Sequence, residues 1–132
     1  MKTITVKTNS KDEFIDITSD VQSAVESSGS EEGICLVFVP HTTAGVTINE
    51  NADPSVQKDI LMALRKAVPD SLSYSHSEGN SPGHIKSSLM GCSIQIFFEK
   101  KRLQLGTWQG IFFCEFDGPR SRKCHIHIIP QP

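Results

Sequence analysis

Residues 34–60 of the chain, ICLVFVPHTTAGVTINENADPSVQKDI, contain a strand, a second strand and a helix in succession. Ile34–Val39 is apolar throughout, which predicts a strand covered on both faces. Val46–Ile48 predicts the second strand. Asp53 and Pro54 predict the start of a helix, because aspartate is a favoured N-cap and proline suits the first turn. Apolar side chains then recur at helical spacing, in Val56, Ile60, Ala63, Leu64 and Ala67.

The segments on either side of this stretch add more strands and one more main helix. Ser19 and Gln22 have the spacing of a capping box, followed by a short apolar helix face that ends at Gly29. Ile85–Met90 predicts only a helical turn. Alternating or apolar runs predict strands at Lys2–Lys7, Phe14–Ile17, Cys92–Phe98, Leu103–Leu105, Gly110–Phe116 and Lys123–Ile129. We therefore expect residues 1–132 to form a single α+β domain of mostly antiparallel sheets with two main helices.

Composition excludes several classes of function. The net charge of −2 gives no reason to expect nucleic-acid binding, which needs a basic surface. We find no apolar run of the length of a membrane span and no N-terminal run resembling a signal peptide, so we expect a cytoplasmic protein without membrane contact. The four cysteines are widely spaced without a C-x-x-C pair, and we expect all of them to be reduced.

Polar side chains gather where the predicted strands end, positions at which a rigid scaffold can hold them for binding or catalysis. Each of them also has an ordinary structural explanation: a hydrogen bond to a backbone carbonyl for His41, helix capping for residues 49–53, core packing for Trp108, and an ion pair for Glu115 and Arg120. Taken together, however, they are more polar residues at strand ends than a stable fold requires, which favours a functional role for the set. They are His41, Thr42, Thr43, Asn49, Glu50, Asn51, Trp108, Gln109, Glu115 and Arg120.

The segment YSHSEGNSPGH, residues 74–84, contains two further histidines around a turn rich in Gly and Pro. A turn between Gly79 and Gly83 can bring His76 and His84 together. Imidazole is the commonest ligand of zinc-like ions, and a catalytic zinc site uses three protein ligands. We therefore predict a divalent metal site, zinc-like or alternatively magnesium, with ligands His41, His76 and His84, and with Glu78 or Glu115 as fourth ligand or general base. The alternative is a solvated loop with two histidines.

Other candidates carry less chemistry. His125 and His127 alternate with apolar residues, which is typical of the polar face of an antiparallel strand, and we expect both to lie outside the metal site. The basic run 120–123 is typical of a solvated turn. Arg120 is the exception, because the preceding Gly118 and Pro119 fix the path of the backbone into it. The sequence lacks the nucleophile-elbow motif, which gives nucleophilic catalysis little support, and it lacks the P-loop and dinucleotide-binding motifs, which disfavours ATP and dinucleotide chemistry.

Three blocks of this sequence closely resemble the signatures of the YjbQ-like proteins, a family also described as secondary thiamine-phosphate synthases. The blocks are HTTAGVTINENADPSVQKDI, YSHSEGN followed by HIKSSLMG, and LGTWQGIFFCEFDGPR. The resemblance runs in order from about Val37 to the C-terminus. It implies a compact α+β fold, a homotrimer, and weak activity in joining hydroxymethylpyrimidine diphosphate to thiazole phosphate.

The resemblance also carries the signature positions over to this chain. It implies catalytic roles for Glu78, Glu115 and Arg120, and binding of a phosphorylated small-molecule substrate by Thr42, Thr43, Asn49, Asn80, Trp108 and Gln109. Two alternatives to this thiamine phosphate synthase-like transferase remain open. One is a metal-dependent hydrolase or lyase of a small phosphorylated metabolite, and the other is a non-catalytic metal or metabolite binder.

Overall fold

The computed structural model describes residues 1–132, which form eight strands and three helices. Their order along the chain is β1 (Lys2–Lys7), β2 (Glu13–Asp16), α1 (Thr18–Ser27), β3 (Gly33–Phe38), β4 (Ala44–Glu50), α2 (Pro54–Ala67), α3 (Ser81–Met90), β5 (Ser93–Glu99), β6 (Arg102–Leu103), β7 (Gln109–Glu115) and β8 (Ser121–Pro130).

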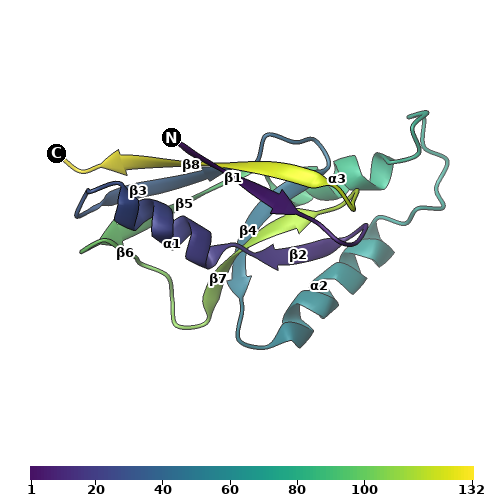
Figure 1. Cartoon of the computed structure of the whole chain (residues 1–132). Coiled ribbons are helices and arrows are strands. Elements are labelled where there is room, and N and C mark those ends of the chain that lie inside the picture. The colour runs from purple at the N-terminus through teal and green to yellow at the C-terminus, as the bar shows by residue number, and fades with distance from the viewer.

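The strands form two antiparallel sheets that lie one above the other (Figure 1). The large sheet has the order β1-β8-β3-β5-β6, and the small sheet has the order β2-β7-β4. Every strand pair in both sheets is antiparallel. The predicted α+β class and the mostly antiparallel pairing are therefore confirmed.

The main core fills the space between the two sheets and α1. Val37 of β3, Phe113 of β7 and Ile126 of β8 are buried in it, because alternate side chains of each strand point inward. α1 adds Val21, Ala24 and Val25 from one helix face. In Figure 1, α1 lies below the large sheet and beside the small one.

β7 is buried on both faces, since a second and smaller core lies on its other side. Phe112, Cys114 and Phe116 form this core, and they pack against partly buried side chains of β2, α2 and α3: Phe14, Leu61, Leu64 and Met90. The apolar run in 110–116 is thus the sequence pattern of the central strand of the small sheet.

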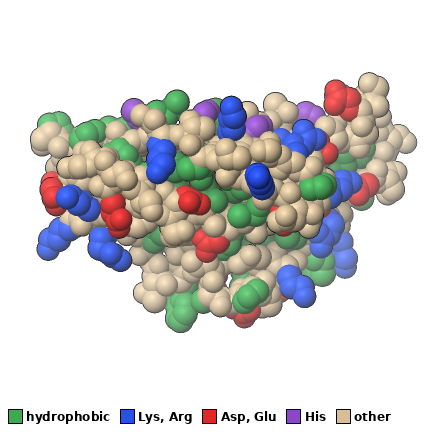
Figure 2. All heavy atoms as spheres, in the orientation of Figure 1, with side chains coloured by type: hydrophobic (Ala, Val, Ile, Leu, Met, Phe, Trp, Pro, Cys, Tyr) green, Lys and Arg blue, Asp and Glu red, His purple; other side chains and the backbone are tan.

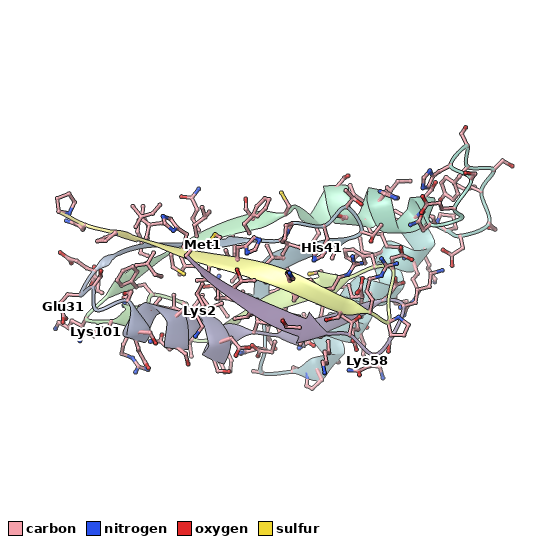
Figure 3. All side chains as sticks on the ribbon, turned by 45° about the horizontal axis from the view of Figure 1, so that its top comes forward. Met1, Lys2, Glu31, His41, Lys58 and Lys101 are labelled. Carbon is pink, nitrogen blue, oxygen red and sulfur yellow. The ribbon has the colours of Figure 1, made fainter.

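β3 is covered on one face only, contrary to the prediction that both faces of Ile34–Val39 are covered. Cys35 and Val37 are completely buried, whereas Ile34 and Leu36 are partly exposed and Phe38 is 41% exposed. The face of the large sheet that points away from the small sheet bears no helix (Figures 1 and 3). We call this surface the outer face.

The outer face carries aromatic, aliphatic and histidine side chains in register. Ile34 pairs with Phe97 of β5 on one side and with Ile129 of β8 on the other. In the next but one row, Phe38 pairs with His125, and their rings stack with centroids 6.4 Å apart. Figure 2 shows histidine side chains along the top of the molecule, where the large sheet lies. His125 and His127 therefore belong to the outer face, as predicted from their alternation.

The helices differ from the prediction in two respects. α3 is a full third helix of ten residues, and it begins inside the histidine segment at Ser81 rather than at Ile85. α1 has no capping box, and Oδ1 of Asp16 accepts from the backbone N–H of Thr18. The Gln22 side chain instead donates to the carbonyl oxygen of Lys101 and accepts from Leu103 N–H. The cap of α2 is as predicted, because Asp53 accepts from Ser55 N–H.

All four cysteines are free thiols, as predicted. No helix is long and apolar enough to cross a membrane.

The packing of α3 onto the small sheet depends on Gly45 of β4. A Cβ added to Gly45 would lie 2.5 Å from the carbonyl oxygen of Gly91, which follows α3. We expect Gly45→Ala to push α3 away from β4 and to lower the free energy of unfolding by about 1–3 kcal/mol, the usual cost of overpacking. Denaturant titration measures this, with exposed Thr5→Ala of β1 as the control. Equal stability of the two variants would contradict this packing.

Candidate functional site

A pocket of about 640 Å³ lies where β3 ends, where β8 begins and where α3 starts. Most of the signature residues of the first two blocks line it, together with the turn that precedes β8. We call it the histidine pocket. Its polar lining consists of His41, Thr42, Thr43, His76, Glu78, Asn80, His84, Cys92, Asp117, Arg120 and Arg122.

His76 and His84 lie side by side in this pocket. Their ring centroids are 5.2 Å apart, and the rings meet edge to face at 87°. His76 Nε2 is also 3.9 Å from Oε1 of Glu78. The structure thus brings together the two histidines of the segment 74–84, but α3 rather than a glycine turn carries His84. Gly83 permits this, because an added Cβ there would lie 2.9 Å from the carbonyl oxygen of Phe116.

His41 lines the same pocket but is already engaged by the backbone. Its Nε2 accepts a hydrogen bond from Lys123 N–H at 2.9 Å. Burial lowers the pKa of the His41 ring, and the positive charge of Arg122 lowers it further, so the ring is neutral near pH 7. A neutral imidazole has one N–H and one acceptor nitrogen. With Nε2 as the acceptor, Nδ1 of His41 carries the proton and serves as a donor.

The fit of a zinc-like ion to these residues is incomplete within one chain. No group of three or more His, Cys, Asp or Glu side chains lies close enough together to hold a metal ion. His76, His84 and Glu78 form a partial donor set, whereas the lone pair of His41 at Nε2 faces Lys123. A three-histidine site as predicted is therefore not assembled by the single chain.

Arg120 is held by Asp117 and not by Glu115. Its Nε donates to the carbonyl oxygen of Asp117 and its Nη2 to Oδ2 of Asp117, both at 3.0 Å. The same Oδ2 accepts from Nδ2 of Asn80 at 2.9 Å, which joins the start of α3 to this turn. Oδ1 of Asn80 is sealed from solvent without a hydrogen-bond partner. Arg120 remains about half exposed at the pocket wall.

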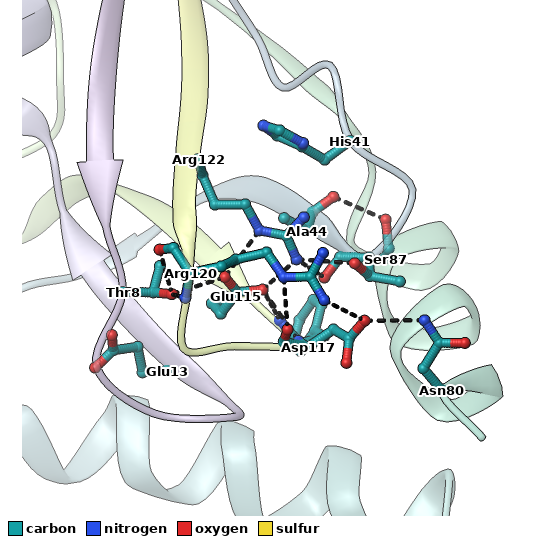
Figure 4. A network of polar contacts seen from close by, with 12 residues as sticks. Thr8, Glu13, His41, Ala44, Asn80, Ser87, Glu115, Asp117, Arg120 and Arg122 are labelled. Atoms are coloured by element: carbon teal, nitrogen blue, oxygen red, sulfur yellow. Dashed lines mark hydrogen bonds and ion pairs between the residues drawn. The ribbon is translucent and has the colours of Figure 1, made fainter. Parts of the chain in front are cut away.

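Glu115 lies behind the pocket wall and not in the pocket (Figure 4). Its side chain is completely buried. Oε1 accepts from Thr8 Oγ1 and from Nε of Arg122, both at 2.8 Å, and Oε2 accepts from Nη2 of Arg122 and the N–H groups of Phe116 and Asp117. With its lone pairs committed in this way, Glu115 acts in the structure as the anchor of Arg122, and the general base of our hypothesis is Glu78.

Arg122 is the site residue that the sequence interpretation missed, because it was assigned to a solvated basic turn. It is 3% exposed, and it is the partner of Glu115 that the sequence interpretation sought in Arg120. One signal could have identified it. Extending the alternation of β8 backward places Arg122 on the same face as buried Cys124 and Ile126, opposite His125 and His127. A charge in a core row needs a buried partner.

The remaining signature residues form a separate group, which we call the distal cluster: Asn49, Glu50, Asn51, Trp108 and Gln109. It lies at the other end of the seven-residue strand β4, where Glu50 pairs with Gln109. The strand rise places the two ends about 20 Å apart. Within the chain this cluster closes turns, since Gln109 accepts from Gly106 N–H and Asn51 N–H donates to the carbonyl oxygen of Trp108. The Trp108 side chain is 64% exposed.

The Glu115–Arg122 pair predicts a pH-dependent stability. Burial by itself would raise the pKa of the Glu115 carboxyl, but hydrogen bonds from Arg122, Asp117 N–H and Thr8 outweigh it and hold the pKa below its usual value. The stabilisation is therefore present above the unfolded pKa of about 4.3 and is lost as pH falls through the lower folded value. At pH 7, Glu115→Gln leaves the buried Arg122 charge uncompensated and should cost about 3 kcal/mol or more of unfolding free energy.

The measurement is denaturant unfolding of the wild type and Glu115→Gln at pH 7, 5, 4 and 3.5. The stability difference should narrow as the pH falls from about 4.3 toward the lower folded pKa, because over this range the carboxyl is protonated in the unfolded chain before it is protonated in the folded one. Glu99→Gln, which alters an exposed carboxylate of β5, is the control and should behave as the wild type does. A difference that stays constant down to pH 3.5 would show that the charge of Glu115 is not what stabilises the fold.

Comparison with known proteins matches this chain to one family. Residues 2–131 match the family described as UPF0047 protein YjbQ-like. UPF0047 protein MJ1081 of Methanocaldococcus jannaschii is 53% identical over 124 residues, covering 94% of this chain and 90% of that protein. UPF0047 protein YugU of Bacillus subtilis is 49% identical over 130 residues, covering 98% of each chain.

Solved structures agree. A crystal structure of a YjbQ/UPF0047 protein from Clostridium acetobutylicum has a TM-score of 0.96 and 56% identity, and the match covers 98% of this chain and 100% of that one. A protein of unknown function from Sulfolobus solfataricus has a TM-score of 0.95 at 34% identity, with 98% and 96% covered. The chain therefore belongs to the UPF0047 family of YjbQ-like proteins.

Proposed function

We propose that the histidine pocket binds a phosphorylated small molecule and that the chain acts on it as a cytoplasmic enzyme. The observation that carries this proposal is the combination of side chains in one pocket. Three imidazoles, the free carboxylate of Glu78 and the guanidinium groups of Arg120 and Arg122 line the same cavity. Imidazoles and a carboxylate transfer protons or hold a metal, and guanidinium groups bind phosphate oxygens.

The reaction we propose is a slow thiamine phosphate synthesis, as the family resemblance implies. The thiazole nitrogen forms a bond to the pyrimidine methylene carbon, and the bond from that carbon to the diphosphate oxygen breaks. The electron pair of the broken bond leaves with pyrophosphate. Arg120 and the Nδ1–H of His41 are donors in the pocket that can offset this departing charge.

The carboxylates of the site support a low rate for this reaction. Pyrophosphate chemistry is usually assisted by magnesium held on carboxylates. In this chain Asp117 is bound to Arg120 and Glu115 to Arg122, so Glu78 is the one acidic side chain of the pocket without a guanidinium partner. A magnesium clamp on two carboxylates is therefore not supported, and departure of pyrophosphate is only partly assisted.

The metal in this proposal is a zinc-like divalent ion held by His76 and His84, with Glu78 beside them. Such an ion supplies Lewis-acid stabilisation of negative charge when it is bound. The chain offers only this partial set, so the remaining ligands come from substrate, water or another protomer. The roles proposed here for Arg120 and His41 do not depend on the ion.

We further propose a homotrimer in which two protomers share each site. Two observations support it. The outer face leaves apolar side chains uncovered, with Phe97 69% and Ile129 44% exposed, and a contiguous exposed apolar surface is typical of an interface. The distal cluster lies too far from the histidine pocket of its own chain to join it. In a closed ring, Trp108 and Gln109 of one protomer can complete the pocket of the next.

One observation favours the metal-dependent hydrolase or lyase as an alternative. Glu78 is exposed and lies 3.9 Å from His76 Nε2, an arrangement suited to a general base beside a metal ligand. Hydrolysis without thiamine phosphate formation would support this alternative. Saturable metabolite binding without any turnover would support the non-catalytic binder.

The first test compares His84→Ala with His127→Ala, which removes the same side chain from the outer face. We expect His84→Ala to lower thiamine phosphate synthesis and bound zinc at least about tenfold, because it removes one of the two adjacent imidazoles. His127→Ala should keep the wild-type activity and zinc content. The readouts are complementation of a strain lacking its thiamine phosphate synthase, activity of the pure protein, and metal content after purification without a histidine tag. Light scattering on both variants controls for assembly.

Rescue of growth by His84→Ala as good as that by the wild type would mean that the site is assigned wrongly. If neither the wild type nor the variants rescue growth or form product, the synthase proposal fails and the hydrolase or binder takes its place.

The second test addresses assembly. At micromolar concentration, light scattering should give three times the protomer mass of 14.5 kDa. Phe97→Lys places a charge in the outer face and should yield smaller species, whereas Leu72→Lys, at an exposed apolar residue before the histidine segment, should not. A monomer mass for the wild type, or an unchanged mass for Phe97→Lys, would count against the outer face as the interface.

A further inference from the structure

Arg122 is a buried cation whose hydrogen bonds leave part of it available to a ligand. Nε donates to Oε1 of Glu115, and Nη2 donates to Oε2 of Glu115 and to the hydroxyl and carbonyl oxygens of Thr43. The Nη1 amino group makes no hydrogen bond within the chain. Because the guanidinium is planar, hydrogen bonds at Nε and Nη2 also fix the direction in which Nη1 points.

The Nη1 group retains access to the pocket. Arg122 lines the histidine pocket, although only 3% of its side chain is exposed. The two polar side-chain atoms that are sealed from solvent without a partner are Asp12 Oδ1 and Asn80 Oδ1, so Nη1 of Arg122 is not sealed. Figure 4 shows Arg122 between β8 and α3, with Glu115 below it and His41 above.

Arg120 repeats this arrangement two residues earlier. Its Nε and Nη2 are used by Asp117, and its Nη1 makes no hydrogen bond within the chain. Each arginine is thus fixed by its own carboxylate, and each keeps one amino group free at the same pocket. The Nδ1–H of His41 adds a third donor from the segment after β3, because its Nε2 accepts from Lys123 N–H.

We propose that Arg120, Arg122 and His41 form a preorganised seat for one phosphate group, so that the phosphoryl end of the substrate binds beside β8. Donors from three side chains of one pocket suit a tetrahedral oxyanion, which offers several acceptor oxygens, better than a planar carboxylate. The donors are fixed before binding, which limits the ordering cost. The inference rests on the proposed function in taking phosphorylated compounds as substrates, and it adds which end of the substrate is held and by which residues.

The test is calorimetric titration of the pure protein with inorganic phosphate, pyrophosphate and acetate, both as purified and after chelation of metals. The variants are Arg122→Lys, which keeps the charge beside Glu115 but loses the fork, and Arg120→Gln at the half-exposed position. Arg102→Gln of β6, at an exposed arginine outside the pocket, is the matched control. Thermal melting of each variant reports whether it is folded.

We expect phosphate or pyrophosphate to bind more tightly than acetate, with or without chelation. Arg122→Lys and Arg120→Gln should each weaken this binding about tenfold or more, and Arg102→Gln should not change it. Unaltered affinity in folded Arg122→Lys would overturn the proposal. If Arg122→Lys does not fold, Arg120→Gln decides, and its unaltered affinity overturns the proposal. So would acetate binding equal to phosphate binding, no phosphate binding, or binding that chelation abolishes.

Failure of this inference can be told apart from failure of the proposed function. Phosphate binding that needs both arginines, in a protein that forms no product, keeps the seat and rejects the activity. Product formation with a KM unchanged in Arg120→Gln and Arg122→Lys keeps the activity and rejects the seat.

Discussion

The buried ion pair between Glu115 and Arg122 is the contact on which the rest of the site depends. Two charges out of water are tolerated only where hydrogen bonds satisfy nearly all of their donors and acceptors. Here Thr8, Thr43 and two backbone N–H groups do so. Since Glu115 lies on β7 and Arg122 on β8, the pair also joins the small sheet to the large one at the base of the histidine pocket.

The acidic residues around the pocket have different roles, because two of them hold arginines and one does not. Glu115 fixes Arg122, and Asp117 fixes Arg120 while it also binds Asn80 at the start of α3. Only Glu78 is left as a carboxylate at the pocket without an arginine partner, and it lies next to His76. The result is a pocket with rigid cationic donors on the β8 side and two adjacent imidazoles on the α3 side, a polarity that fits an anionic substrate.

Two surface features of the chain have no role within a single copy of it. The core between the sheets and the core behind β7 both consist of residues buried within this chain. The outer face nevertheless presents Phe97 and Ile129 to solvent, and the exposed Trp108 belongs to the distal cluster, remote from the histidine pocket. A second copy placed against this chain would cover the first feature and give the second a function, which is why we regard assembly and activity as linked.

The sequence by itself determined the α+β class, most of the strands and the cap of α2, because these follow from local periodicity and local hydrogen bonding. It also identified His41, His76, His84 and Arg120, all of which line one pocket. Only the tertiary structure decided that Glu115 pairs with Arg122, that His41 Nε2 faces Lys123, and that Trp108 lies at the opposite end of β4. Those facts arise from contacts between strands distant in sequence, and a buried charge shows its role only through the partner that lies against it in space.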